Sequence, residues 1–176
     1  SVYINDFLMK LPKEKWKPVV VNFSAQTTAH QTQDIIMGKL DKRRKGYFGP
    51  PMGQKCVVFV DDVNMPTIEE YGAQPPIELL RQWFGQGGWY DRKELVFRKL
   101  IDLVFVASMG PPGGGKQDVT PRFLRHFNMI GYVEMSKSST SMIFSMILSD
   151  FLANFEGGLV AMTEDIVHSS IDVFDT

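Results

Sequence analysis

The chain has a single cysteine, Cys56, among its 176 residues, and it lacks any long hydrophobic run. One cysteine cannot form an intramolecular disulfide, which excludes a secreted disulfide scaffold, and the paired-cysteine metal motifs are excluded with it. The longest charge-free apolar stretch, residues 138–149, is rich in serine and falls short of the roughly 20 apolar residues that cross a bilayer. The sequence therefore predicts neither a disulfide-stabilised nor a membrane-spanning protein.

An excess of charge of one sign is also missing, because 19 basic residues face 20 acidic ones. This balance does not favour a chain built mainly to bind nucleic acid. Hydrophobic residues make up 44% and charged residues 22%, so a core can form and disorder is not expected. The length corresponds to about one domain at roughly 100–200 residues per domain. The first residue is Ser1, and the sequence begins with neither methionine nor a signal peptide.

Hydrophobic periodicity predicts strands that alternate with helices. Pro12 ends the first expected helix, which opens directly at Ser1. The expected helices cover residues 1–11, 28–42, 75–84, 139–155 and 163–174, and the expected strands cover residues 18–23, 56–62, 101–108 and 127–135. Loops or hairpins are expected over residues 43–55 and 89–97, and the Gly157-Gly158 pair is expected to stop the fourth helix. This order predicts an α/β fold with a mostly parallel sheet and a helical tail.

The clearest chemical motif is the apolar strand that ends Val60-Asp61-Asp62. Ligands of open α/β sheets lie beyond the carboxyl ends of the strands. There Asp61 can hold a hydrated Mg²⁺, which prefers few protein carboxylates together with water and phosphate oxygens. Asp62 can orient or deprotonate an attacking water. The alternative is a strand that simply leaves the sheet through a polar turn.

A glycine-rich segment, residues 110–117 (GPPGGGKQ), nearly matches the phosphate-loop pattern GxxxxGK[ST]. Gln117 stands where a hydroxyl should meet Mg²⁺, and Pro121 comes too soon for the long helix that the pattern requires. We therefore interpret the segment as a flexible loop near the site. The true phosphate loop is expected immediately before Ser1, ahead of the acidic strand.

Arg122 and Arg125 lie three residues apart before the last expected strand. At a domain edge, such an arginine can reach the γ-phosphate of a neighbour as an arginine finger. The alternative is an ordinary basic helical turn. The histidines and Cys56 show no metal-ligand spacing, and hydrolase elbows, HExxH and GxGxxG are absent from the sequence.

Several stretches together resemble the third AAA+ module of a dynein heavy chain of the axonemal (ciliary) type. They are residues 57–66 (VVFVDDVNMP), 71–81 (YGAQPPIELLR), 108–116 (SMGPPGGGK) and 120–128 (TPRFLRHFN), with shorter matches at residues 1–4, 48–51 and 89–91. The resemblance extends over nearly the whole chain. It implies an AAA+ P-loop-type parallel sheet flanked by helices, followed by the start of a helical lid.

The resemblance also assigns roles to individual residues. Ser1 resembles the last serine of the Walker A loop, whose hydroxyl touches Mg²⁺, and Asp61 resembles the Walker B carboxylate that binds the same ion. Asp62 stands where an AAA+ ATPase usually has its catalytic glutamate. Gly110 falls at the sensor-1 position, where a polar side chain is expected, and Ser108 is a possible substitute for it.

Arg122 is the best match to the arginine finger and Arg125 the second, and either would act on the nucleotide of the adjacent module. Asp62 is one methylene shorter than the usual glutamate, and Gly110 cannot contact a phosphate with a side chain. Both departures imply weak or slow hydrolysis. They suit a regulatory nucleotide site that gates the main ATPase of the first module.

The expected domains are a large α/β subdomain over residues 1–137 and the beginning of the helical lid over residues 138–176. By this resemblance the large subdomain lacks its first, central strand and most of the Walker A loop. The later lid segments, with any sensor-2 arginine, would also lie outside the sequence. We therefore expect a domain cut at both ends, with little or no ATP affinity by itself.

The implied protein is a microtubule-based, ATP-driven motor for ciliary or flagellar movement, and this module would bind ATP or ADP with Mg²⁺. The implied partners are neighbouring AAA+ modules, microtubules through a distant stalk, and dynein intermediate and light chains, with no nucleic acid and no membrane. The expected location is the cytoplasm and cytoskeleton, in the axoneme of a cilium or flagellum. Two alternatives stay open: a structural ring module without nucleotide turnover, and a different P-loop enzyme such as a remodelling ATPase. A GxxxxGK stretch before Ser1 would favour nucleotide binding.

Overall fold

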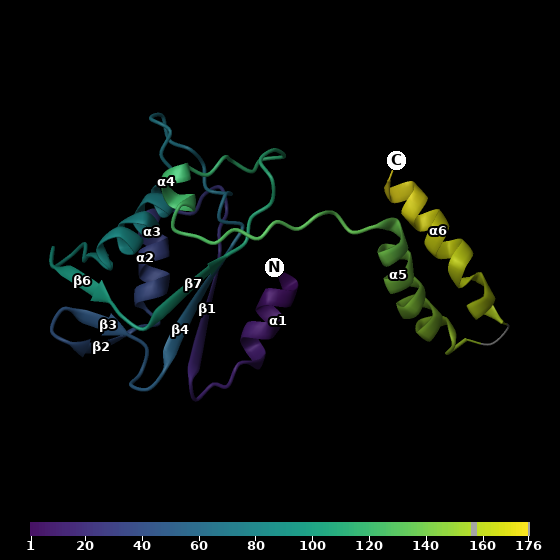
Figure 1. Cartoon of the computed structure of the whole chain (residues 1–176), viewed down its shortest axis with the longest axis horizontal. Coiled ribbons are helices and arrows are strands. Elements are labelled where there is room, and N and C mark those ends of the chain that lie inside the picture. Colours follow the sequence, from purple (N-terminus) through teal and green to yellow (C-terminus); the bar gives the residue numbers. More distant parts are fainter. Residues whose placement is uncertain (156–157, 176) are drawn as a thin grey trace. The chain divides into compact units, whose positions relative to one another are not determined.

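The computed structural model describes residues 1–155 and 158–175, and it divides into two compact units, Ser1–Met129 and Ile130–Thr176. The first unit contains a parallel sheet of β1 (Trp16–Asn22), β4 (Lys55–Asp61) and β7 (Leu103–Ala107) in the order β1-β4-β7 (Figure 1). The register aligns Asn22 with Asp61 and Val60 with Ala107. The carboxyl ends of the three strands therefore meet at one edge of the sheet.

Strand β4 lies in the middle of this sheet because its sequence is apolar on both sides. Residues 56–60 are all buried, as expected for a parallel strand that is covered on both faces. On one face, Phe59 and Val57 pack with Leu8 of helix α1 (Val2–Lys10). On the other face lie helices α2 (Ala29–Met37) and α3 (Pro75–Gln86), whose buried apolar residues belong to the larger core cluster. Figure 1 shows α1 on the opposite side of the sheet from α2 and α3.

A second, mixed sheet forms in and around the two segments that the sequence predicted to be loops or hairpins, residues 43–55 and 89–97, and its strands extend beyond both. Its strands are β2 (Asp41–Arg44), β3 (Tyr47–Gly49), β5 (Gly88–Tyr90) and β6 (Phe97–Leu100), in the order β2-β3-β6-β5. The second helix ends at Met37 and not at Lys42 as the periodicity suggested, and β2 begins at Asp41, within the range predicted to be helical. A capping box at Thr28 and Gln31 marks the start of this helix, one residue before Ala29.

One predicted strand is wrong. Residues 127–135 form no strand in the described structure, and only a short helix, α4 (Pro121–Leu124), precedes them. A strand is stabilised by hydrogen bonds to a neighbouring strand, and none of the described strands pairs with this apolar run. The hydrophobic pattern alone did not reveal whether a partner strand was present.

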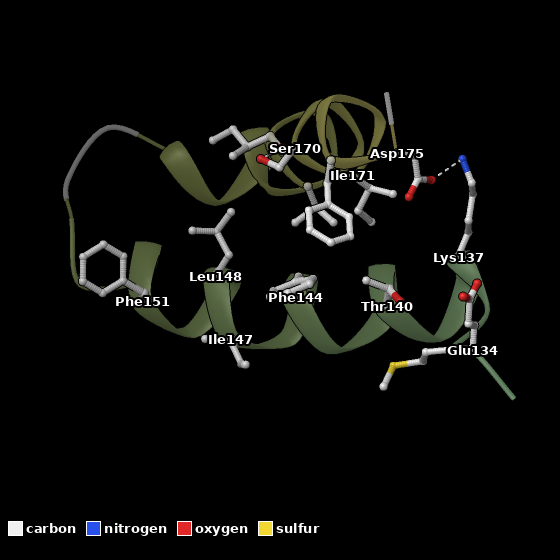
Figure 2. A pocket seen from close by; sticks show the side chains of 14 residues that line it. Glu134, Lys137, Thr140, Phe144, Ile147, Leu148, Phe151, Ser170, Ile171 and Asp175 are labelled. Atoms are coloured by element: carbon white, nitrogen blue, oxygen red, sulfur yellow. Dashed lines mark hydrogen bonds and ion pairs between the residues drawn. The ribbon is translucent and has the colours of Figure 1, made fainter. Parts of the chain in front are cut away.

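The second unit is a helical hairpin of α5 (Lys137–Leu152) and α6 (Thr163–Phe174), joined in part by the short helix η1 (Leu159–Met162). Figure 2 shows apolar side chains, among them Phe144 and Ile171, lining a groove of about 900 Å³ between the two helices. An ion pair of 2.6 Å from Lys137 Nζ to Asp175 Oδ2 joins the start of α5 to the end of α6 and raises the pKa of Lys137. Helix α5 ends before the predicted Gly157-Gly158 stop, of which Gly157 lies outside the described residues.

None of the helices in the described ranges is long and apolar enough to cross a membrane. Helix α5 comes nearest in length, but serines interrupt its apolar surface.

Cys56 is expected to resist alkylation in the folded chain. Its side chain is fully buried, and burial raises its pKa to about 11, an effect that nearby Lys17 only partly opposes. Because the thiolate is the nucleophile, iodoacetamide at about pH 8 should label Cys56 only after denaturation. Mass spectrometry of native and denatured samples measures this, and fast labelling of the native chain would contradict the buried position.

Candidate functional site

Asp61 ends strand β4, and two donors hold its carboxylate in place. The hydroxyl of Ser108, which directly follows β7, donates a short hydrogen bond to Asp61 Oδ1. The backbone N–H of Asp62 donates to the same oxygen at 3.0 Å. Within the described residues no donor reaches the second oxygen, Oδ2, and the residue is half-buried. One carboxylate oxygen is thus oriented while the other remains available to a ligand.

Adjacent parallel strands bring Ser108 and Asp61 together. Val60 lies opposite Ala107 in the register, so the next residue of each strand lies at the same edge. The backbone extends this contact, because Ser108 N–H donates to Val60 O and Val63 N–H donates to Ser108 O, both at 3.0 Å.

Asp62 begins a tight turn and has a left-handed backbone, with φ of 52°. An aspartate tolerates this conformation better than most residues, although it is uncommon outside glycine. The turn closes where Met65 N–H donates to Asp62 O at 2.9 Å. One side-chain oxygen of Asp62 lies 3.2 Å from Lys116 Nζ, so the two carboxylates of the pair have different neighbours.

Hydrogen bonds join the glycine-rich loop, residues 110–117, to the turn that follows Asp62. Gly113 and Lys116 exchange two backbone hydrogen bonds of 3.0 Å, and Gln117 N–H donates to Asn64 O at 2.9 Å. The side-chain amide of Asn64 in turn donates to Gly110 O at 2.9 Å. A Cβ on Gly110 would lie 2.6 Å from Lys116 Nζ, so the absent side chain leaves room for the lysine.

Sequence reasoning missed two residues of this site, Lys116 and Asn64. The lysine was considered only as part of a failed phosphate loop, and the structure places it against Asp62. Asn64 is 1% exposed, and its Oδ1 has no hydrogen-bond partner in the described structure. Their positions in the sequence could have identified both residues. Asn64 follows the acidic pair by two residues, and Lys116 ends the glycine run that follows β7.

Ser1 lies at the amino end of α1. The short connection from α1 to β1 and the contacts of Leu8 with Val57 and Phe59 make this helix run opposite to the strands (Figure 1). Its amino end is therefore directed toward the edge of the sheet where Asp61 lies. The free N–H groups and the dipole of a helix amino end favour anions.

The structure does not bring the two arginines into this cluster. Phe123, which is 1% exposed, anchors α4 in the core, while Arg122 and Arg125 are exposed to solvent. Neither arginine forms an ion pair with the described part of the chain. Both guanidinium groups are thus free to contact another molecule or another part of a larger assembly.

The arrangement suits a magnesium nucleotide better than a metal held by protein alone. No group of three or more histidine, cysteine or acidic residues within residues 1–155 and 158–175 could hold a metal ion. Mg²⁺ in nucleotide sites needs only one or two carboxylates, with water and phosphate oxygens as its other ligands. An oriented aspartate at the carboxyl end of a parallel sheet, with a helix amino end at the same edge, is consistent with a P-loop-type α/β fold of the AAA+ kind.

Residues 1–135 match the family model described as the P-loop containing dynein motor region, so the chain belongs to that family. It is 53% identical to dynein axonemal heavy chain 12 of Mus musculus over 177 residues, which cover 99% of this chain and 6% of that protein. It is 49% identical to dynein axonemal heavy chain 1 of Rattus norvegicus, over 97% of this chain and 4% of that protein. It is 56% identical to dynein axonemal heavy chain 3 of Mus musculus, over 84% of this chain and 4% of that protein. The chain therefore spans a small part of the length of each relative.

Proposed function

We propose that the chain is a nucleotide-binding module in the motor ring of an axonemal dynein heavy chain, the third AAA+ module of that ring. The observation that carries this proposal is Asp61, with Oδ1 held by two donors and Oδ2 free, in a chain of the dynein motor family. The bound nucleotide would be ATP or ADP with Mg²⁺. The module would act as a regulatory site with weak or slow hydrolysis.

Each side chain of the site has a distinct task in this proposal. Asp61 Oδ2 would hold the Mg²⁺, while Ser108 and the Asp62 amide keep the carboxylate from rotating. The bound ion would neutralise phosphate charge. The hydroxyl of Ser1, at the amino end of α1, would be a second ligand of the same ion. Arg122, with Arg125 as second choice, would reach the nucleotide of a neighbouring module, which suits their exposed positions.

Slow turnover has support in the surroundings of Asp62. The carboxylate that should orient a water is one methylene shorter than glutamate, whatever its partner. In the structure it is also paired with Lys116 at 3.2 Å, and this pair must open before the carboxylate can orient a water. Gly110 offers no side chain to a phosphate. The second candidate function is a structural ring module that relays movement without turnover. It is favoured if Asp62 keeps this ion pair when nucleotide is bound, because a carboxylate held by Lys116 is not free to orient a water.

The domain organisation is part of the proposal. The outer edge of β7 is unpaired in the described structure, although its sequence, LVFVA, is typical of an inner strand, and Val104 is 42% exposed. We expect the central strand of the complete module to pair there, followed by the Walker A loop. Residues 1–137 would form the large subdomain and residues 138–176 the start of the lid.

The relatives are named as axonemal dynein heavy chains, which supports an axonemal location. We accordingly propose a microtubule-based motor of cilia or flagella, with neighbouring ring modules, microtubules and dynein intermediate and light chains as partners. Its proposed location is the cytoskeleton of the cytoplasm and the axoneme.

The proposal is tested with a chain extended on both sides through the complete module. Asp61→Ala should weaken ATP binding at least about tenfold in calorimetry with Mg²⁺, because the substitution removes the carboxylate that binds the ion. Asp6→Ala, on the exposed surface of α1, serves as the matched control and should leave the affinity unchanged. Equal ATP binding by the Asp61→Ala and unchanged chains would rule out this nucleotide site.

A further inference from the structure

Lys116 is a cation held at the acidic edge of the sheet by the glycine-rich loop. Its ammonium lies 3.2 Å from Asp62, with 33% of the lysine side chain and 45% of the aspartate side chain exposed. An ion pair so open to water contributes little to stability, and it exchanges partners easily. Stabilisation of the fold therefore does not account for the place of this lysine.

The loop around Lys116 is shaped to bring the amine to this position. Gly113, Gly114 and Gly115 have positive φ values of 121°, 57° and 89°. Residues other than glycine rarely adopt such backbone angles. They form the tight turn that Gly113 and Lys116 close with two backbone hydrogen bonds. The lysine then folds back over Gly110, where an ordinary Cβ would collide with it.

We infer that Lys116 is the residue by which this site distinguishes a nucleoside triphosphate from a diphosphate. With no terminal phosphate present, Lys116 pairs with Asp62. When a triphosphate binds, the ammonium transfers to the oxygens of its terminal phosphate, and Asp62 is released. This inference rests on the proposed nucleotide site at Asp61.

Charge and reach support the exchange. Asp61 and Asp62 are adjacent residues at one edge of the sheet, and a Mg²⁺ held by Asp61 would share phosphate oxygens with the nucleotide. A terminal phosphate carries more negative charge than one carboxylate, so it competes well for an ammonium with three donors. A diphosphate lacks the group that would compete, and Lys116 would stay on Asp62.

The exchange also couples nucleotide state to the reactivity of Asp62. While Lys116 is paired with it, the carboxylate is neutralised and orients water poorly. After the transfer, the same carboxylate is free to accept a hydrogen bond from water. Lys116 is therefore a specificity-determining residue that touches the nucleotide and restrains Asp62 in turn.

The test uses the full-length heavy chain and reads binding at this site alone. Azido derivatives of ADP and of a non-hydrolysable ATP are cross-linked by light at increasing concentrations with Mg²⁺, and labelled peptides from this module are quantified by mass spectrometry. In Lys116→Met, which keeps the length of the side chain, half-saturation by the ATP analogue should rise about tenfold, while that for ADP should change less than about twofold. Lys39→Met removes the same charge from an exposed position and should alter neither value.

Gly110→Ala provides a second, independent variant. Its backbone conformation lies outside the left-handed region, so alanine is tolerated, but the new Cβ would lie 2.6 Å from Lys116 Nζ and displace the amine. The same selective loss of ATP affinity is expected. In the double variant with Lys116→Met, Gly110→Ala should cause no further loss of ATP affinity, because both substitutions remove the same contact between the lysine and the nucleotide.

The outcomes separate this inference from the proposed function. Equal losses for both nucleotides would make Lys116 a structural clamp, and no loss would leave it without a role in binding; either result overturns the inference. If Asp61→Ala removes labelling by both nucleotides, the site itself stands in either case. If this module takes up no label, or if its label is insensitive to Asp61→Ala, the nucleotide site falls and the inference falls with it.

Discussion

Replacing Phe59 with alanine is expected to lower the free energy of unfolding of the Ser1–Met129 unit by about 3–5 kcal/mol. Phe59 is 1% exposed in the middle of the central strand, where it packs with Val57 and Leu8. The substitution removes a large buried surface and leaves a cavity between the sheet and α1 that close-packed neighbours cannot fill. Since small domains are stable by about 5–15 kcal/mol, a large share of the stability is at risk.

Urea unfolding followed by tryptophan fluorescence measures this loss. Trp16, Trp83 and Trp89 all lie in the same unit, so the signal reports on that unit alone. Tyr71→Ala is the matched control, because Tyr71 is 93% exposed and its loss should change the midpoint little. A loss below about 1 kcal/mol for Phe59→Ala would show that α1 does not cover the sheet as described.

The second large effect is expected at Gly88, where β5 meets β6. A Cβ there would lie 2.1 Å from the backbone oxygen of Arg98 and 2.9 Å from Lys99 Cα, contacts that only a backbone shift can relieve. Gly88→Ala should therefore destabilise the unit by about 2–3 kcal/mol through overpacking against the β6 backbone.

Gly85, three residues before Gly88, supplies a control for which we expect a gain in stability instead of a loss. It lies exposed in α3, and a Cβ built there meets no atom within 4 Å. Gly85→Ala should stabilise the unit by about 0.5–1 kcal/mol, because alanine loses less backbone freedom in a helix than glycine. The two midpoints in urea are compared directly, and similar shifts from both variants would argue against the β5–β6 pairing.

Local patterns in the sequence were enough to predict most of the elements. The run from Cys56 to Val60 predicted a buried strand in a mostly parallel sheet, and all five residues are buried in β4. The last amphipathic helix was expected over residues 163–174, the bounds it has as α6. In both cases the signal is local, because periodicity and burial are properties of adjacent residues.

Long-range pairing could not be read from the same patterns. The apolar run over residues 127–135 has the composition of a strand but pairs with none in the described structure. In the other direction, β2, β3, β5 and β6 are too short to show a convincing alternation, yet they pair into one sheet from segments about 40 residues or more apart. A strand exists only where a neighbour accepts its hydrogen bonds.

The sequence by itself determined the buried apolar strand, its terminal carboxylates and the motifs that resemble a dynein motor module, because each depends on residues close together in the chain. Only the tertiary structure decided what those carboxylates meet. Ser108 reaches Asp61 because β7 lies beside β4, and Lys116 reaches Asp62 because three glycines turn the loop back over Gly110. The physical reason is that a side chain's charge and hydrogen bonds depend on distance in space, which the register of the sheet and the path of one loop set here.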